Sequence, residues 1–207
     1  MLKIYGHSNS INVRKVLWLC DELGLPYVQE EWGGGFKSVD EPEFRKLNPF
    51  GVVPVIENEG AIIRESNTIL RYLARKYGGI SLLPAGPLRR AQVEQWMDWQ
   101  ATDLNSAWRY AFLSLVRKNS NFQDHASVAA SVAQWTAQMR LLDQELTTAH
   151  PYVCGPQFTL ADIPVGLSVN RWFMTPIDRP ELPAVARYYD LLTLRRPFVI
   201  HGRNGRP

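Results

Sequence analysis

Two segments determine the architecture of this chain: Leu47-Asn48-Pro49-Phe50-Gly51-Val52-Val53-Pro54-Val55-Ile56 and Arg64-Glu65-Ser66-Asn67-Thr68. Proline has no N–H for a strand ladder, so Pro54 belongs at the start or the edge of a strand. The X-Pro bond accepts the cis form at low cost, and a cis bond here would turn the backbone N–H and C=O of Val53 outward. Glu65 and Ser66 offer a carboxylate, a hydroxyl and the free amides of a helix start, which complement an amino acid's ammonium and carboxylate. Together the segments predict a site for a small peptide with a free α-amino-acid end.

The pattern around these segments predicts a small mixed α+β domain over residues 1–77. Strands are expected at 2–5, 27–32, 53–57 and 61–64, and helices at 11–23, 42–47 and 66–77. The order β-α-β-α-β-β-α is typical of a thioredoxin-like domain, which has a mixed four-stranded sheet between helices.

An all-helical domain is expected over residues 89–207, after a Gly- and Pro-rich linker at 78–88. Apolar residues at helical spacing predict long helices over about 93–115 and 128–146, and a last helix over about 181–194. The tail from His201 is rich in Gly and Arg and is expected to be frayed.

A capping box is predicted at the segment 158–163. Thr159 can cap a helix while Asp162 bonds back to the cap's N–H, with apolar staple residues on either side. Pro164 conflicts locally with this helix because it removes one intrahelical hydrogen bond at the fifth helical position, so a bend or a compensating neighbouring group is expected there.

Composition excludes several classes of protein. The chain has 207 residues and a net charge of +3, which is too small to argue for nucleic-acid binding. It shows neither a signal peptide nor a run of 18 apolar residues, so we expect a cytoplasmic protein that does not enter a membrane. Cys20 and Cys154 form no Cys-x-x-Cys pair, which fits a reducing compartment, and Cys20 is expected to be buried. The scattered histidines, namely His7, His125, His150 and His201, argue against a metal site.

The first two segments resemble the glutathione-binding core of the cytosolic glutathione transferases, in which an N-P-x-G-x-V-P segment precedes an E-S pair. The resemblance implies a thioredoxin-like domain joined to an all-helical domain. It also implies that Val53, before Pro54, pairs with the cysteinyl backbone of glutathione, and that Glu65 and Ser66 hold its γ-glutamyl end. Val52 departs from the pattern, because many relatives have a polar residue there.

The loop Gly6-His7-Ser8-Asn9-Ser10-Ile11 should carry the chemistry. A thiol is a poor nucleophile until it ionises, and the loop leads into a helix start. It resembles the plant phi class, which assigns the activating hydroxyl to Ser10. It also resembles a bacterial group with S-x-N-V before a basic residue, which makes Asn12 a second or joint donor, and Ser8 is a further candidate. Ser10 could also be a plain helix cap.

Other site residues are expected from the same resemblance. Lys37, on the loop after three glycines, could pair with the glycine carboxylate of glutathione or be an exposed loop lysine. A hydrophobic electrophile is expected near Trp108, Tyr110, Phe112 or Arg117, and the run 170–173 could border the same cleft, although aromatic residues at helical spacing are usually core. Tyr5 is expected to point into the core, and no cysteine occupies the loop, which argues against thiol-exchange chemistry.

The sequence is therefore identified as a member of the bacterial cytosolic glutathione transferases, serine-type and phi- or theta-like. Glutathione is expected as co-substrate with no metal or redox cofactor. The resemblance implies a homodimer whose interface involves the third, fourth and fifth helices. Two alternatives remain open: a glutathione-dependent peroxidase, isomerase or dehalogenase, and a non-catalytic binding or stress protein on the same fold.

Overall fold

One mixed sheet organises the first part of the chain. The structure is a computed structural model that describes residues 1–148 and 151–207. Its four strands are β1 (Leu2–Tyr5), β2 (Tyr27–Glu30), β3 (Val55–Asn58) and β4 (Ala61–Arg64). They pair in the order β2-β1-β3-β4, with β1 parallel to β2 and the other two pairs antiparallel. The predicted mixed four-stranded sheet is confirmed.

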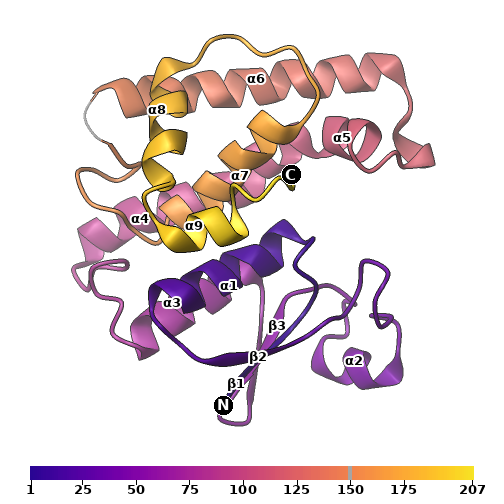
Figure 1. Cartoon of the computed structure of the whole chain (residues 1–207), viewed down its shortest axis with the longest axis vertical. Helices are drawn as coiled ribbons and strands as arrows, with labels where there is room; N and C mark the ends of the chain where they lie inside the picture. The colour runs from indigo at the N-terminus through magenta and orange to yellow at the C-terminus, as the bar shows by residue number, and fades with distance from the viewer. Residues whose placement is uncertain (149–150) are drawn as a thin grey trace.

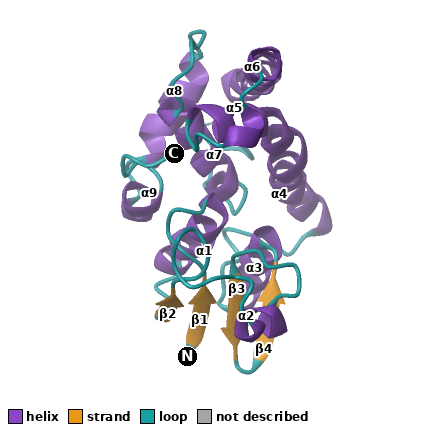
Figure 2. Cartoon of the chain, turned by 90° about the vertical axis from the view of Figure 1, so that its right-hand side faces the viewer, coloured by secondary structure: helices purple, strands orange, loops and turns teal. Residues whose placement is uncertain are grey.

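Helices cover both faces of this sheet because its strands alternate buried side chains between the faces. Helices α1 (Ile11–Glu22) and α3 (Ser66–Lys76) pack against one face with Ile4 and Ile56. The short helix α2 (Pro42–Leu47) lies on the other face, where Tyr5 and Val55 pack with Trp32 and Phe44. Figure 2 shows α1 and α3 between the sheet and the remaining helices.

The rest of the chain is helical. Its helices are α4 (Pro87–Trp99), α5 (Asn105–Leu115), α6 (His125–Thr148), α7 (Asp162–Met174), α8 (Pro183–Leu192) and α9 (Arg196–His201), with a short 3-10 turn at Ser120–Phe122. Helix α1 contacts both α7 and α9, so the first helix is covered by the sheet on one side and by the helical part on the other (Figure 1).

The predicted strand ends differ slightly from those in the structure. The strand expected at 53–57 begins at Val55, because Pro54 has no N–H for the ladder. The strand expected to reach Trp32 ends at Glu30, since the chain turns there to pack the Trp32 ring against Phe44, with ring centroids 5.2 Å apart.

A single helix over 93–115 is a wrong prediction. A π-helical turn, Gln100–Leu104, separates α4 from α5. The Gln100 side chain is buried in this turn, accepts a hydrogen bond from Lys15 Nζ (2.9 Å) and donates to Ser168 Oγ (3.0 Å). Those long-range bonds fix the turn's position, and the apolar pattern carries no trace of them.

The capping residues form the predicted back-bond but not the whole box. The backbone N–H of Thr159 donates to Asp162 Oδ2 (2.7 Å), and the Thr159 hydroxyl donates to the same oxygen (3.0 Å) instead of accepting from the helix. The expected bend at Pro164 is also wrong. Helix α7 begins at Asp162, so Pro164 lies in the first turn, where the amides have no intrahelical partner to lose.

The expectation of a frayed tail is wrong as well. The chain forms α9 and then lies against α1 and α7. Arg14, buried in α1, donates to the backbone oxygens of Arg206 (3.1 Å) and Pro207 (2.5 Å), while Asn170 Nδ2 donates to Arg206 O (2.7 Å). Buried donors on two helices thus hold the tail in place.

Within residues 1–148 and 151–207, no helix has both the length and the apolar character needed to cross a membrane. Among the same residues, no group of three His, Cys, Asp or Glu side chains is placed to hold a metal ion. His150 lies outside the described residues. Cys20 is fully buried, as predicted, and burial raises the pKa of its thiol to about 12.

Candidate active site

Two adjoining cavities of about 350 Å³ each open where α1 and α3 meet the helical part of the chain. The first, called here the Glu65 cavity, is lined by Asn12, Lys15, Glu65, Ser66, Asn67, Thr68, Asp98, Gln100, Ala101 and Asn105. The second, called the Ser10 cavity, is lined by His7, Ser10, Ile11, Asn105, Trp108, Arg109, Phe112, Leu113, Arg117 and Arg171. Asn105 lines both, so a ligand of peptide size could extend from one into the other.

The Glu65 cavity contains the acidic-hydroxyl pair at the start of α3. Glu65 precedes the helix at a left-handed φ of 67°, a conformation that non-glycine residues rarely adopt and that is often found at ligand sites. The Ser66 hydroxyl lies 3.4 Å from Asn12 Oδ1. The cavity therefore combines an exposed carboxylate, a hydroxyl, an amide and the free N–H groups of a helix start.

Lys15 is a member of this cavity that the sequence analysis missed. Its side chain is buried, and its Nζ lies 2.9 Å from Gln100 Oε1 and 3.5 Å from Ser66 Oγ. Burial, with a smaller effect from Arg171, lowers the pKa of Lys15 to about 7, while Glu65 opposes that change. Only the fold could show this, because Lys15 sits on a helix whose other buried residues are mostly apolar.

The Ser10 cavity brings together several predicted residues. Ser10 is the residue before α1, and its side chain makes no capping hydrogen bond to the helix. Across the cavity lie Trp108 and Phe112, with ring centroids 5.4 Å apart, and Arg117, whose guanidinium is 5.5 Å from the Phe112 centroid. Ser10 thus shares a cavity with aromatic side chains of α5 and with the cationic Arg117 that follows it.

Two further residues of this cavity matter. Arg171, from the run 170–173, is buried in α7 and lines the cavity. The other residues of the run do not line the cavity. Asn170 forms hydrogen bonds with the C-terminal tail and with Tyr189. Trp172 packs against Trp135, and Phe173 packs against Tyr189. His7 is also buried beside the cavity, and burial together with the charge of Arg117 lowers its pKa. The sequence analysis treated His7 only as part of the loop motif.

Val53 lies close to the loop that carries Ser10. The Val53–Pro54 peptide bond is cis, and among the described residues neither the N–H nor the C=O of Val53 has a hydrogen-bond partner. A Cβ added to Gly6, at φ 145°, would meet Val53 Cβ at 3.0 Å. The close approach of Gly6 therefore places a free backbone edge next to the first loop.

Lys37, Tyr110 and Tyr5 lie outside both cavities. Lys37 is exposed, with its Nζ 4.9 Å from the Trp32 ring centroid and 3.9 Å from Glu30 Oε2. The Tyr110 ring packs against Phe122 instead of facing the cavity. Tyr5 points away from the first loop, as expected, and its hydroxyl donates to Glu57 Oε2 (2.7 Å).

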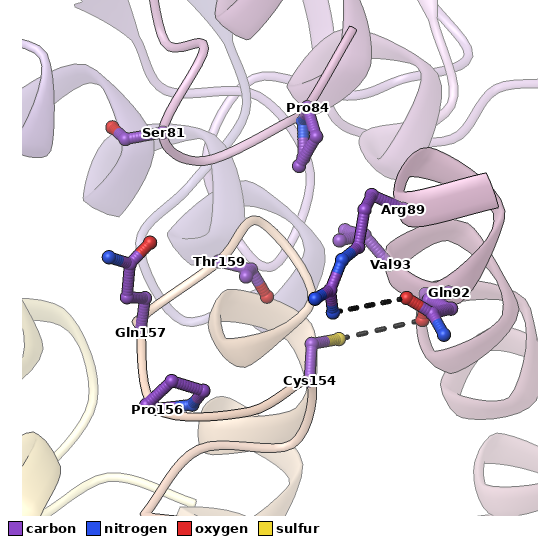
Figure 3. Close-up of a pocket in the computed structure, with 9 residues that line it drawn as sticks. All are labelled: Ser81, Pro84, Arg89, Gln92, Val93, Cys154, Pro156, Gln157 and Thr159. Carbon is purple, nitrogen blue, oxygen red and sulfur yellow. Dashed lines mark hydrogen bonds between the residues drawn. The ribbon is translucent and has the colours of Figure 1, made fainter. Parts of the chain in front are cut away.

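Another cavity, of about 340 Å³, lies between α4 and the loop before α7 (Figure 3). None of the predicted site residues lines it. Cys154 points into it, 3.5 Å from Gln92 O, but burial raises the pKa of this thiol to about 12. A thiol that stays protonated at neutral pH is a poor nucleophile, so this cavity is a weaker candidate for chemistry than the adjoining pair.

Comparisons with known proteins show which family the whole chain resembles. Residues 4–81 match the family described as "Glutathione S-transferase, N-terminal domain". The chain is 36% identical over 201 residues to glutathione S-transferase GstB of Escherichia coli, covering 96% of each chain. Its structure is similar to that of the theta class glutathione S-transferase of Xanthomonas axonopodis pv. citri, solved with glutathione bound. The TM-score is 0.91 and the sequence identity 38%, and the match covers 97% of this chain and 96% of that one. It is also 33% identical over 194 residues to a probable elongation factor 1-gamma of Arabidopsis thaliana, but covers only 45% of that protein.

Proposed function

Because the chain belongs to the glutathione S-transferase family, and is a glutathione transferase, we propose how its two cavities divide the work. The Glu65 cavity binds the γ-glutamyl end of glutathione, and the Ser10 cavity receives the electrophile. The thiol lies between them, beside the first loop. The observation that carries this proposal is that Asn105 lines both cavities, while Ser10 and Ser66 lie in different ones.

In this proposal glutathione is held mainly by groups at the ends of elements. Glu65 pairs with the α-ammonium, and Ser66 with the first amides of α3 binds the α-carboxylate. The free backbone N–H and C=O of Val53 pair with the cysteinyl residue, beside Pro54. To bind the glycine carboxylate, the Lys37 side chain must move away from Glu30 and Trp32. These contacts permit the movement because an exposed ion pair contributes little free energy.

We propose that Ser10 stabilises the thiolate, aided by the start of α1 and by Asn12. Lowering a thiol pKa by ~2 units takes ~2.7 kcal/mol. A hydrogen bond to a charged group supplies ~1.5–3 kcal/mol and a helix dipole ~0.3–1 kcal/mol, which together suffice. The Ser10 hydroxyl makes no capping hydrogen bond to α1, which supports this choice. Asn12, by contrast, already contacts Ser66.

Steady-state kinetics of Ser10→Ala test the assignment. Turnover near neutral pH should fall ~10- to 100-fold, the equivalent of one charge-assisted hydrogen bond, while KM for glutathione changes little. A raised KM with unchanged turnover would instead place Ser10 in glutathione binding. Asn12→Ala is the matched comparison and should mainly raise KM.

The kind of reaction is a separate question, since a peroxidase, an isomerase or a dehalogenase would use the same thiolate. Glutathione consumption with aryl halides, epoxides and organic hydroperoxides separates these activities. The non-catalytic alternative predicts a broken glutathione site, so calorimetry with millimolar glutathione should then show no binding.

We also propose a homodimer in a reducing, cytoplasmic setting, without a metal or redox cofactor. Phe50 and Val52, on the loop before β3, are 73% and 50% exposed, and exposed apolar side chains of this size often mark an interface. The exposed faces of α3, α4 and α5 are the proposed partner surface. Sedimentation analysis of the chain and of Phe50→Ser tests the dimer.

A further inference from the structure

Arg171 is the most unusual charged residue in the molecule. Its side chain is 3% exposed, and its Nε is buried with no hydrogen-bond partner. Among the described residues its guanidinium forms no ion pair. The guanidinium instead lies over two aromatic rings. Its Cζ is 3.9 Å from the Phe112 ring centroid and 4.2 Å from the Trp108 ring centroid.

Burying a guanidinium in this way costs free energy that aromatic contacts offset only in part. A cation over a ring gains ~2 kcal/mol when desolvated, and its N–H donors still need acceptors. Burial and the charges of Arg14 and Arg117 lower the pKa of Arg171. An unpaired buried charge is expected where a ligand supplies the missing partner.

Beyond the two aromatic rings, the charged side chains that share the Ser10 cavity with Arg171 are cationic. Arg109 on α5 and Arg117 just after it are exposed and line the same cavity, and the buried His7 Nδ1 also lacks a partner. No carboxylate lines this cavity in the part of the chain that the structure describes. The adjoining Glu65 cavity has two acidic residues: Glu65 raises the pKa of Lys15, and Asp98 pairs with Arg71.

We propose that the electrophile carries a carboxylate that pairs with Arg171. This inference rests on the proposed function and narrows its second substrate from a hydrophobic molecule to an anionic one. A guanidinium binds a carboxylate through two parallel hydrogen bonds, which fixes the substrate's orientation. Arg117 and Arg109, at the mouth, attract the anion towards the cavity.

The chemistry needs no further reactant. The thiolate sulfur attacks the electrophilic carbon, an S–C bond forms, and the carbon–halogen bond breaks as halide leaves with its electron pair. The substrate carboxylate is unchanged and stays paired with Arg171. A cavity of about 350 Å³ is within the range that accommodates a small aromatic acid.

A matched pair of substrates tests this inference. The pair is a para-chlorobenzoate activated by two nitro groups and the corresponding benzamide, which differ mainly in charge. The wild-type protein should favour the acid in kcat/KM, after each value is divided by its uncatalysed rate constant with glutathione. Arg171→Met should reduce that preference by ~10-fold or more, the equivalent of one charged hydrogen bond, and Arg171→Lys should keep part of it.

Arg89→Met is the control, since it removes the same charge from the distant cavity of Figure 3 and should leave the preference unchanged. Because Arg171→Met could fold poorly, inhibition of the wild-type protein is a second test. The chlorine-free dinitrobenzoate should compete with the electrophile more strongly than the dinitrobenzamide.

Two results would overturn the inference. A wild-type protein that treats acid and amide alike, as substrates and as inhibitors, would show that no anion is recognised. An equal loss with both substrates in Arg171→Met would show that Arg171 acts on the thiolate. In either case, ultraviolet absorbance of the bound thiolate shows whether the proposed glutathione chemistry stands by itself.

Discussion

At the scale of single residues, the site depends on charges that water does not reach. Lys15 and Arg171 are both buried beside the cavities, and both have lowered pKa values. A buried cation raises the local positive potential for nearby anions because little solvent screens it. Such a site can favour a thiolate and two carboxylates of a peptide at once.

Lys15 should make stability depend on pH. Its pKa is about 7 in the folded protein and about 10.4 in an unfolded chain, so the unfolded state binds more protons between those values. The free energy of unfolding should therefore rise with pH from about 7 to about 10. In Lys15→Met that rise should be smaller, as measured by urea unfolding at about pH 6.5, 8 and 9.5.

Lys46→Met provides the control for this experiment, because Lys46 is exposed on α2, and it should keep the wild-type slope. Identical slopes in Lys15→Met and the wild-type protein would mean that Lys15 is fully charged when folded.

Residues of this kind show where sequence reasoning ends. Glu65, Ser66 and Val53 could be proposed as site residues because the roles proposed for them depend on local backbone structure, a helix start and a residue before proline. Lys15 could not, and Arg171 could be named only as part of the run 170–173, since the surroundings of both come from helices more than fifty residues away. The chain gives no local sign that Lys15 meets Gln100 or that Arg171 meets Phe112.

At the scale of elements, the start of α7 carries the densest set of buried polar contacts. Asp162 is fully buried and accepts from Thr159 N (2.7 Å), Val153 N (3.1 Å) and the Tyr188 hydroxyl (3.1 Å). It thus ties the helix start to the preceding loop and to α8. The three-residue spacing between Thr159 and Asp162 made the back-bond predictable, whereas the contacts to Val153 and Tyr188 depend on tertiary packing.

Asp162→Ala should lower the free energy of unfolding by ~3 kcal/mol or more, because several buried donors lose their acceptor at ~1–3 kcal/mol each. Denaturant unfolding followed by tryptophan fluorescence measures this change. Asp178→Ala, at an exposed position, should shift stability by less than ~0.5 kcal/mol. A similar small shift in Asp162→Ala would contradict the structural role given to this residue.

The π-helical turn between α4 and α5 is another element that no apolar pattern indicates. Such turns often occur at functional sites, and here the turn presents Gln100 to Lys15 beside the Glu65 cavity. The prediction of one long helix was reasonable for the apolar spacing alone. The long-range hydrogen bonds of Gln100 account for the difference.

At the scale of the whole molecule, distant segments meet at the first loop. Arg206 Nη1 donates to Asn9 Oδ1 (2.8 Å), and Arg117 Nη2 donates to Asn9 O (3.1 Å). The residue before Ser10 is therefore held by the tail from one side and by α5 from the other. The sheet and its helices were predictable from pattern, but this arrangement depends on how the tail crosses α1.

Removing residues 203–207 should loosen the first loop while leaving the sheet intact. Amides of residues 7–10 should exchange hydrogen ~10-fold faster, because two tail contacts to the loop and to α1 are lost, whereas those of β3 should be unchanged. Hydrogen exchange followed by mass spectrometry measures both regions. Arg203→Met, which removes an exposed ion pair with Asp190 and a contact with the Tyr189 ring but no contact to the loop, should leave the loop's exchange unaltered. Equal protection in the shortened chain would show that α5 alone holds the loop.

The most direct test concerns the ionised sulfur itself, titrated by ultraviolet absorbance of glutathione bound to the wild-type protein, Ser10→Ala and Ser8→Ala. Ser8 lines a different cavity, beside Arg14, so its hydroxyl is the matched control. We expect the bound thiol pKa to lie ~2 units below the free value of ~8.5, to rise by ~1 unit or more in Ser10→Ala, and to stay in place in Ser8→Ala. A pKa that is the same in Ser10→Ala as in the wild-type protein would contradict the role assigned to Ser10.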